Sequence, residues 1–250
     1  MTGPVAVITG ASAGLGVEFA RQLSARGHRL VLVARRKDRL DELAEELGNA
    51  RSVELDLSDP SAAGFLMADL IRNGETADLL INNAGFGLAG GFAELDPRRQ
   101  REMIDLNCGA LEELARAMLP GMIERGSGGI LNVASTAAFQ PGPGMAVYFA
   151  TKAFVLSFSE ALHDEMKPQG IKVSCLCPGP TSTEFRSVSG FDPKGRLSKL
   201  SADAKSVVRA GLRGLEANKA VVVPGLSNKL ISQANRFFPR AFMRRAARMR

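Results

Sequence analysis

The feature that most constrains this chain is a regular alternation of short apolar, β-branched runs with segments of helical periodicity. Strands of continuous apolar character are buried on both faces, as in parallel sheets whose crossover helices cover them. Strands are predicted at 5–9, 30–33, 52–55, 79–81, 129–133, 173–177 and 221–223. Helices are predicted at 15–26, 39–47, 111–125, 149–166 and 202–217. The alternation therefore predicts an α/β fold: a doubly wound, seven-stranded parallel sheet with helices on both faces.

The pattern of predicted strands and helices indicates one domain. Residues 1–225 contain no proline- or serine-rich linker and no repeat of fixed period, so we expect a single domain there. The connection at about 181–202 is long for a strand-to-helix link and contains glycine, proline and scattered apolar residues. Such connections are usually functional or disordered. Its apolar residues favour a lid over a substrate pocket.

The positive charge is concentrated at the C-terminus. The chain of 250 residues has 32 Lys and Arg against 26 Asp and Glu, and residues 226–250 hold seven basic side chains and no acidic one. The body is therefore close to neutral, and the chain has no Trp and one Tyr. A nucleic-acid-binding face usually combines a basic patch with stacking aromatics, so no nucleic-acid partner is expected. The basic, amphipathic extension 226–250 either packs on a neighbouring subunit or associates weakly with an anionic membrane surface.

Composition excludes several other classes of protein. No stretch of 18 or more apolar residues predicts a membrane span, and the N-terminal region lacks signal-peptide features. Three cysteines are too few and odd in number for a disulfide framework, and with two histidines no metal site is expected. Cys175 and Cys177 are expected to face opposite sides of one strand. These features predict a cytoplasmic protein with reduced thiols and no metal.

A glycine-rich loop follows the first predicted strand and runs directly into a helix. Gly10, Gly14 and Gly16 follow the pattern G-x-x-x-G-x-G. Glycines there permit a tight turn and let backbone N–H groups approach a pyrophosphate at the helix N-terminus. The second strand is followed by Arg35 and Arg36, where an NAD-specific site places an acid. Since an arginine fork grips a 2′-phosphate, we predict NADP(H), with Arg35 as the main contact and Arg36 as the second. A solvated basic helix start is the alternative.

Three residues form a candidate catalytic group. Tyr148 is the only tyrosine, and Lys152 lies one helical turn later on the same face. A neighbouring ammonium favours the phenolate, so the pKa of Tyr148 is expected to fall toward neutrality. The hydroxyl would then serve as an acid toward a carbonyl and a base toward an alcohol. Ser135, directly after the fifth strand, could hydrogen-bond the same carbonyl oxygen. The alternative for the Tyr–Lys pair is a surface contact.

Taken together, these motifs resemble the short-chain dehydrogenase/reductase family over residues 5 to about 225. They comprise T-G-x-x-x-G-x-G at 9–16, Asp56, N-N-A-G at 82–85, Asn107, Ser135, Y-x-x-x-K at 148–152, and Pro178-Gly179 with Thr181 and Thr183. The resemblance implies a Rossmann fold and points to the NADP(H)-dependent ketone reductase and alcohol dehydrogenase branch. It implies cofactor contacts from Gly10, Ser12, Ala13, Gly14, Leu15, Gly16, Arg35, Arg36, Asp56, Leu57, Asn83, Ala84, Gly85, Tyr148, Lys152, Pro178, Gly179, Thr181 and Thr183.

The same resemblance implies a mechanism and an assembly. NADPH delivers hydride to a carbonyl carbon while Tyr148 protonates the developing alkoxide. Lys152 binds the nicotinamide ribose and lowers the pKa of Tyr148, and Ser135 orients the carbonyl. Asn107 holds a helix kink and a water of a proton relay. A homo-oligomer, dimer or tetramer, is usual in the family, and no metal is required.

The substrate is predicted only by class. Small and apolar residues surround the inferred pocket and favour bulky, hydrophobic ketones bound mainly through burial. The residues proposed to line it are Ala137, Phe139, Met145, Phe185 and Phe191. Simple loop and helix packing is the alternative for these positions. Two other functions stay open: a reductase of 3-oxoacyl thioesters or steroid-type substrates, and a non-catalytic NADP(H)-binding regulator.

Overall fold

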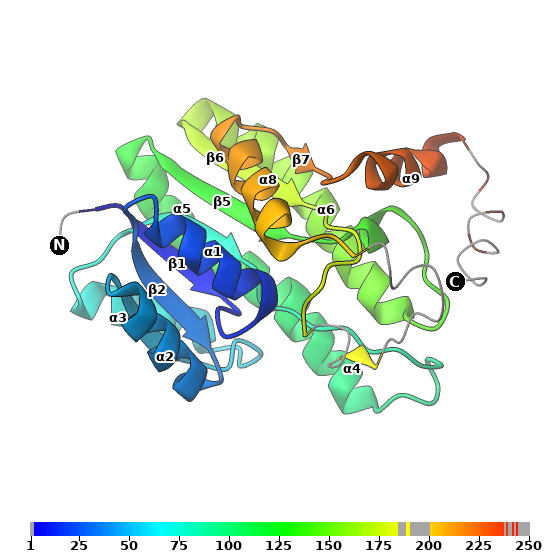
Figure 1. Ribbon diagram of the computed structural model, residues 1–250, viewed down its shortest axis with the longest axis horizontal. Helices are drawn as coiled ribbons and strands as arrows, with labels where there is room; N and C mark the ends of the chain where they lie inside the picture. The colour runs from blue at the N-terminus through cyan, green and yellow to red at the C-terminus, as the bar shows by residue number, and fades with distance from the viewer. Residues whose placement is uncertain are drawn as a thin grey trace.

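The computed structural model describes residues 3–184, 189–190 and 201–237, together with residues 239, 242 and 244. Its described strands form one seven-stranded sheet in the order β3-β2-β1-β4-β5-β6-β7 (Figure 1). Every neighbouring pair is parallel. The strands are β1 (Val5–Thr9), β2 (Arg29–Ala34), β3 (Ala50–Glu54), β4 (Ala77–Asn82), β5 (Gly128–Val133), β6 (Ile171–Leu176) and β7 (Val221–Val222). The predicted fold class is confirmed.

Helices cover both faces of this sheet (Figure 1). Helices α1 (Gly14–Ser24), α2 (Lys37–Leu47) and α8 (Ala204–Glu216) pack on one face, and α3 (Ala62–Arg72), α5 (Leu111–Arg125) and α6 (Ala146–Met166) on the other. The remaining described helices are α4 (Pro97–Ile104), η1 (Asp105–Ala110), η2 (Thr136–Phe139), η3 (Lys167–Gln169) and α9 (Leu226–Phe237). Alternate residues of β1 show how the faces divide, because Ile8 joins the first core and Val7 the second.

Two helices, α3 and α4, were not anticipated from the sequence. In α3 the buried pair Leu66 and Leu70 has helical spacing, but exposed Phe65 and Ile71 interrupt the apolar stripe. Helix α4 is strongly polar, and its identifiable signal is the start: Asp96 accepts a hydrogen bond from the Arg98 N–H at 2.8 Å, with a proline at the first position. Apolar periodicity alone therefore misses helices that bury little.

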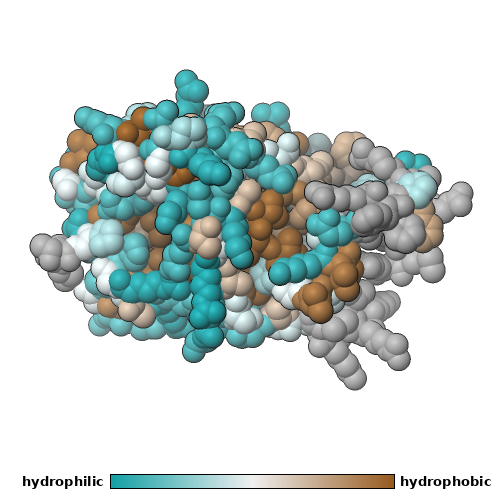
Figure 2. Space-filling view, turned by 90° about the horizontal axis from the view of Figure 1, so that it is seen from above, coloured by the Kyte–Doolittle hydropathy of each residue, from teal (hydrophilic) through white to brown (hydrophobic). Residues whose placement is uncertain are grey.

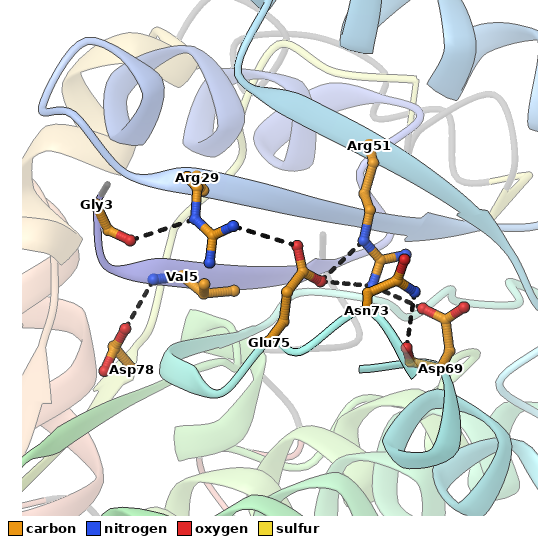
Figure 3. Close-up of polar contacts among 8 residues, drawn as sticks. All are labelled: Gly3, Val5, Arg29, Arg51, Asp69, Asn73, Glu75 and Asp78. Carbon is orange, nitrogen blue, oxygen red and sulfur yellow. Dashed lines mark hydrogen bonds and ion pairs between the residues drawn. The ribbon is translucent and has the colours of Figure 1, made fainter. Parts of the chain in front are cut away.

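The amino ends of the strands carry an ion-pair network (Figure 3). The Glu75 carboxylate accepts two hydrogen bonds from the Arg51 guanidinium, at 2.9 and 2.7 Å, and lies 3.9 Å from Arg29. Arg51 also lies 2.7 Å from the Asp69 carboxylate, so β2, β3 and α3 meet at this network. The Glu75 side chain is 10% exposed. The network ties the edge of the sheet that lies opposite the carboxyl ends of the strands.

Polar residues cover much of the face shown in Figure 2, and apolar side chains gather in a patch near its middle. Helix α9 covers the first half of the predicted extension, and its Leu226 and Leu230 are exposed. No described helix has the length and apolar character needed to cross a membrane. Most of the predicted lid, at 185–188 and 191–200, lies outside the described residues. The lid, the domain boundary and the role of the extension stay predictions.

One expectation about the strands is wrong. Cys175 and Cys177 lie on the same side of the chain, with their sulfur atoms 3.7 Å apart. Residues two apart in a strand share a face, since the side-chain period is two. Both thiols are buried and free.

Candidate active site

The glycine loop brings bare backbone to the N-terminus of α1. Gly10 and Gly14 have φ values of +65° and +55°, which favour glycine. A Cβ on Gly16 would lie 2.1 Å from the Gly10 carbonyl oxygen, so only glycine fits there. No side chain caps α1, and its first turn has no acid. A helix start without a side-chain cap, together with the helix dipole, therefore suits a pyrophosphate, and these residues fit a dinucleotide cofactor.

The two arginines after β2 have different partners. The Arg36 guanidinium donates to the Ser12 hydroxyl at 3.2 Å and to the Ser12 carbonyl at 3.3 Å, so it lies against the glycine loop. Arg35 instead turns toward α4 and pairs with Glu102 at 3.2 Å and Asp56 at 3.6 Å. The geometry gives Arg36, which was expected to be the second contact, the position beside the loop.

Residues after β3 and β4 complete the cofactor side of the site. Asp56 accepts hydrogen bonds from the Ser58 N–H and hydroxyl at 3.0 and 2.7 Å, and Leu57 is buried beside it. These bonds and the nearby Arg35 lower the pKa of Asp56, against the opposing effect of its partial burial. The Asn83 amide donates to the carbonyls of Thr9 and Gly10 at 2.9 and 3.2 Å. The loops after β1 and β4 are thus joined directly.

Thr9 is the residue that fixes this junction, and the sequence reasoning did not single it out. Its hydroxyl accepts the backbone N–H groups of Asn83 and Ala84 at 3.0 and 2.9 Å. Its position inside the T-G-x-x-x-G-x-G motif was the available signal. Next to it, a Cβ on Gly85 would lie 2.7 Å from the Asn107 side-chain oxygen, so this glycine lets two parts of the site touch.

Ser135, Tyr148 and Lys152 meet at the carboxyl end of β5. Ser135 hydrogen-bonds Tyr148, and its hydroxyl also accepts the Ala137 N–H at 3.1 Å. The Lys152 ammonium donates to the Val133 carbonyl at 2.9 Å and lies 5.9 Å from the centre of the Tyr148 ring. Tyr148 and Lys152 are both buried. The structure therefore brings Ser135, which follows β5, to the Tyr148–Lys152 pair of α6.

Asn107 lies in η1, a π-helical turn between α4 and α5. Its amide donates to the Phe86 carbonyl at 2.9 Å and to the Thr151 hydroxyl at 3.0 Å, and its oxygen accepts the Phe86 N–H at 3.0 Å. Thr151 in turn donates to the Tyr148 carbonyl at 2.7 Å. Such wide turns recur at functional sites. Here the turn links Asn107 to the Tyr148–Lys152 helix through Thr151, a residue that the sequence reasoning missed.

Burial controls the pKa values of Tyr148 and Lys152. Desolvation raises the pKa of Tyr148 to about 12, and the hydrogen bond with Ser135 opposes it. Desolvation also lowers the pKa of Lys152 to about 8, while the thiols of Cys108, Cys175 and Cys177 oppose that shift. The expected fall of the Tyr148 pKa toward neutrality is wrong. Burial outweighs an ammonium that contacts a carbonyl rather than the phenol.

The segment after β6 lies over the glycine loop. Thr183 is close enough to Gly14 that a Cβ there would lie 3.1 Å from it. Thr181 donates to the Gly179 carbonyl at 3.0 Å and pairs with Ala202 in a short parallel bridge. The Pro178 carbonyl accepts the Thr136 N–H at 2.8 Å, which holds this segment beside the turn after β5.

The predicted substrate-pocket residues divide into three groups. Ala137 and Met145 pack with Tyr148 in one apolar cluster that includes Phe86 and Met103. Phe139 lines a neighbouring cavity of about 680 Å³, whose other lining residues include Gly142 and Phe149. Phe185 and Phe191 lie outside the described residues. In the part of the chain that the structure describes, no three His, Cys, Asp or Glu side chains gather as a metal site.

The sequence reasoning also missed a network of buried polar side chains that connects the sheet to α6. Asn82 donates to the Asn132 side-chain oxygen at 3.0 Å, and Asn132 donates to the Ser159 hydroxyl at 3.0 Å. All three residues are buried. Isolated Asn and Ser residues inside predicted strands and helices give no signal that they will meet. The network joins β4, β5 and α6, and α6 carries Tyr148 and Lys152.

Comparison with known proteins agrees with this arrangement. Residues 4–192 match a family model described as short chain dehydrogenase. The chain is 38% identical over 200 residues to the NADP-dependent 3-hydroxy acid dehydrogenase YdfG of Salmonella typhi, covering 76% of this chain and 79% of the relative.

Two solved structures share the fold at similar identity. A short-chain dehydrogenase from Sphingobium yanoikuyae in complex with NADPH has a TM-score of 0.83 at 35% identity, with 94% of each chain covered. The bulky-bulky ketone specific alcohol dehydrogenase from Comamonas testosteroni has a TM-score of 0.79 at 32% identity, with 94% of this chain and 92% of that chain covered.

Proposed function

The chain belongs to the short chain dehydrogenase family, and from that premise we propose that it is an NADP(H)-dependent carbonyl reductase that also runs as an alcohol dehydrogenase. The observation that carries the proposal is the buried group of Ser135, Tyr148 and Lys152 beside a glycine loop that fits a dinucleotide. A relative named as NADP-dependent and a neighbour solved with NADPH support NADP(H) as the cofactor.

We propose that Arg36 is the main contact of the 2′-phosphate, because its guanidinium already lies on Ser12 of the glycine loop. Arg35, held by Glu102 and Asp56, would take the second place at the adenine side. This order reverses the one expected from the sequence. It follows from the direction in which each side chain leaves the end of β2.

The catalytic steps use groups of this chain. The bound cofactor supplies a hydride to the carbonyl carbon of the substrate. Tyr148 donates its phenolic proton to the carbonyl oxygen, while the Ser135 hydroxyl stabilises the negative charge that develops there. Lys152 keeps its ammonium beside Tyr148 and is available to the cofactor ribose. Asn107, held by Phe86 and Thr151, positions the helix turn through which a proton can return to Tyr148.

The substrate we propose is a bulky or hydrophobic ketone. Tyr148 packs in an apolar cluster with Phe86, Met103, Ala137 and Met145, which favours burial of apolar groups of a substrate. The Comamonas testosteroni neighbour is named for bulky ketones, whereas the Salmonella typhi relative is named for 3-hydroxy acids. An assay panel should therefore compare diaryl ketones, small 3-oxo acids and a 3-oxoacyl thioester. A cytoplasmic location and a dimer or tetramer stay predictions.

Replacement of Tyr148 by Phe tests the mechanism. The change removes the proton donor and preserves the ring, so kcat for ketone reduction should fall about 10²–10⁴-fold. The dissociation constant of NADPH, measured by fluorescence titration, should stay within about twofold because the cradle around Gly14 is untouched. Ketone reduction at the wild-type rate by the variant would refute this role. Loss of NADPH binding would show that the substitution disturbed the fold instead.

A further inference from the structure

An acidic side chain lies in the arginine cluster beside the glycine loop. The segment after β6, yellow in Figure 1, returns past the start of α1, where Thr183 lies against Gly14. The next residue is Glu184, whose carboxylate reaches α2 and its preceding turn. Glu184 therefore approaches the site from an element that the cofactor must also contact.

The contacts of Glu184 are made to two guanidinium groups at once. One carboxylate oxygen lies 2.8 Å from the Arg39 NH1 atom, and the other lies 3.1 Å from NH1 of both Arg36 and Arg39. The hydrogen bonds from Arg39 and from Arg36 lower the pKa of Glu184, so the side chain is ionised at neutral pH. Arg36 simultaneously holds Ser12, which places the carboxylate and the glycine loop on the same guanidinium.

A carboxylate between two arginines occupies the kind of position that a phosphate monoester takes. A 2′-phosphate brings about −1.5 to −2 charge at pH 7. With Glu184 present, the cluster of Arg36, Arg39 and Glu184 offers one net positive charge, and without it two. The approaching phosphate must displace the carboxylate or bind next to it, and either outcome weakens its binding.

We propose that Glu184 is a specificity-determining residue that competes with the cofactor 2′-phosphate for Arg36 and Arg39 and so sets how strongly the protein prefers NADP(H) over NAD(H). The inference rests on the proposed placement of the 2′-phosphate at Arg36. It adds that the affinity for NADP(H) is held below what the two arginines alone would provide. A weaker grip on the phosphate also favours release of the oxidised cofactor, a step that limits turnover in many enzymes.

Glu184→Gln tests this competition in the full chain without substrate. The variant keeps the size of the side chain and removes its charge. NADPH should bind about three- to tenfold more tightly than to the wild type, because a half-exposed opposing charge has been removed. NADH, which lacks the phosphate, should change less than about twofold. The gain for NADPH should shrink as salt rises, since exposed charges are screened.

Glu46→Gln is the matched control. Glu46 also accepts hydrogen bonds from an arginine, Arg21, at 2.7 and 2.8 Å. The Glu46 side chain is about as exposed as that of Glu184. Because Glu46 lies outside the arginine cluster, this change should leave both affinities unaltered. Glu184→Asp, which keeps the charge, should stay closer to the wild type than Glu184→Gln.

A second probe separates this inference from the proposed activity. Adenosine 2′,5′-bisphosphate carries the phosphate and lacks the nicotinamide, so it should show the same gain in Glu184→Gln as NADPH, with AMP as its control. Unchanged or weaker NADPH binding, or equal tightening of both cofactors, would overturn the inference. Failure of the protein to reduce any ketone would count against the proposed function alone, because these titrations measure only binding.

Discussion

At the scale of single residues, the buried ammonium of Lys152 has a backbone atom as its partner. Lys152 is 6% exposed, and its ammonium donates to the Val133 carbonyl at the end of β5. The strand therefore fixes the position of this charge, and substitution of a neighbouring side chain would leave the acceptor in place. Burying an ammonium costs free energy, and the lowered pKa of Lys152 measures that cost.

This burial predicts how stability varies with pH. The pKa of Lys152 is about 8 in the folded protein against 10.5 for the unperturbed group, so the unfolded chain binds more protons between those values. Stability contributed by Lys152 therefore rises as pH increases through 8. From pH 7 to 9.5 the free energy of unfolding of the wild type should gain about 1–2 kcal/mol relative to Lys152→Met.

Urea denaturation of both proteins across this range measures the difference. The range stops below pH 10 because the pKa of Tyr148 is raised from 10 to about 12. Above pH 10 its contribution to the free energy of unfolding therefore falls as pH rises, opposite to that of Lys152. Parallel stability curves for the two proteins would show that Lys152 is not titrating in this window.

At the scale of elements, the sequence was most informative where burial is complete. The predicted strands match the observed ones to within a few residues. The signal is clearest in β1 and β2, which are apolar runs buried almost throughout, and weaker in β3, whose residues are only partly buried. Helices α3 and α4 were not predicted from the sequence. In α3 the exposed Phe65 interrupts the apolar pattern, and α4 buries mainly Gln100 and Met103. The catalytic residues were recognisable by spacing, whereas the partners of Arg35 and Glu184 depend on side-chain directions that no local pattern encodes.

The glycine loop gives a prediction at this scale. Gly16→Ala places a Cβ 2.1 Å from the Gly10 carbonyl oxygen, so the loop must shift away from α1. NADPH binding should weaken at least about tenfold, and the free energy of unfolding should fall by about 1–3 kcal/mol, the usual cost of overpacking.

Gly64→Ala is the matched control for this change. Gly64 lies inside α3, and a Cβ there meets nothing within 4 Å. The substitution should stabilise the protein by up to about 1 kcal/mol, the difference in helix propensity between the two residues, and leave NADPH binding unchanged. Thermal unfolding and NADPH titration of both variants provide the comparison. Tight NADPH binding by Gly16→Ala would contradict the proposed cradle.

At the scale of the whole molecule, the candidate active site and the ion-pair network lie at opposite ends of the strands. The glycine loop, Ser135 and the Asn83 turn follow the carboxyl ends of strands. The network of Glu75 with Arg51 and Arg29 joins the amino ends (Figure 3). The rigid sheet between them holds both sets in place.

Glu75→Gln should separate the two edges experimentally. The change leaves Arg51, itself partly buried, with Asp69 as its described acidic partner. The free energy of unfolding should fall by about 1–3 kcal/mol, the usual cost of breaking a partly buried charged hydrogen bond. Meanwhile kcat for ketone reduction by the remaining folded protein should change less than about twofold. A large fall in kcat with unchanged stability would show that the ion-pair network at the amino ends of the strands affects the candidate active site.

The strand order also has a consequence for how the chain is made. β1 lies inside the sheet, β2 and β3 add outward on one side of it, and β4, β5, β6 and β7 add outward in turn on the other. Each strand leaving the ribosome thus meets an edge that is already available, and no later strand has to open an earlier pair. The glycine loop therefore leaves the ribosome before Tyr148 and Lys152, so the first part of the cofactor site is made before the residues proposed to act on the substrate.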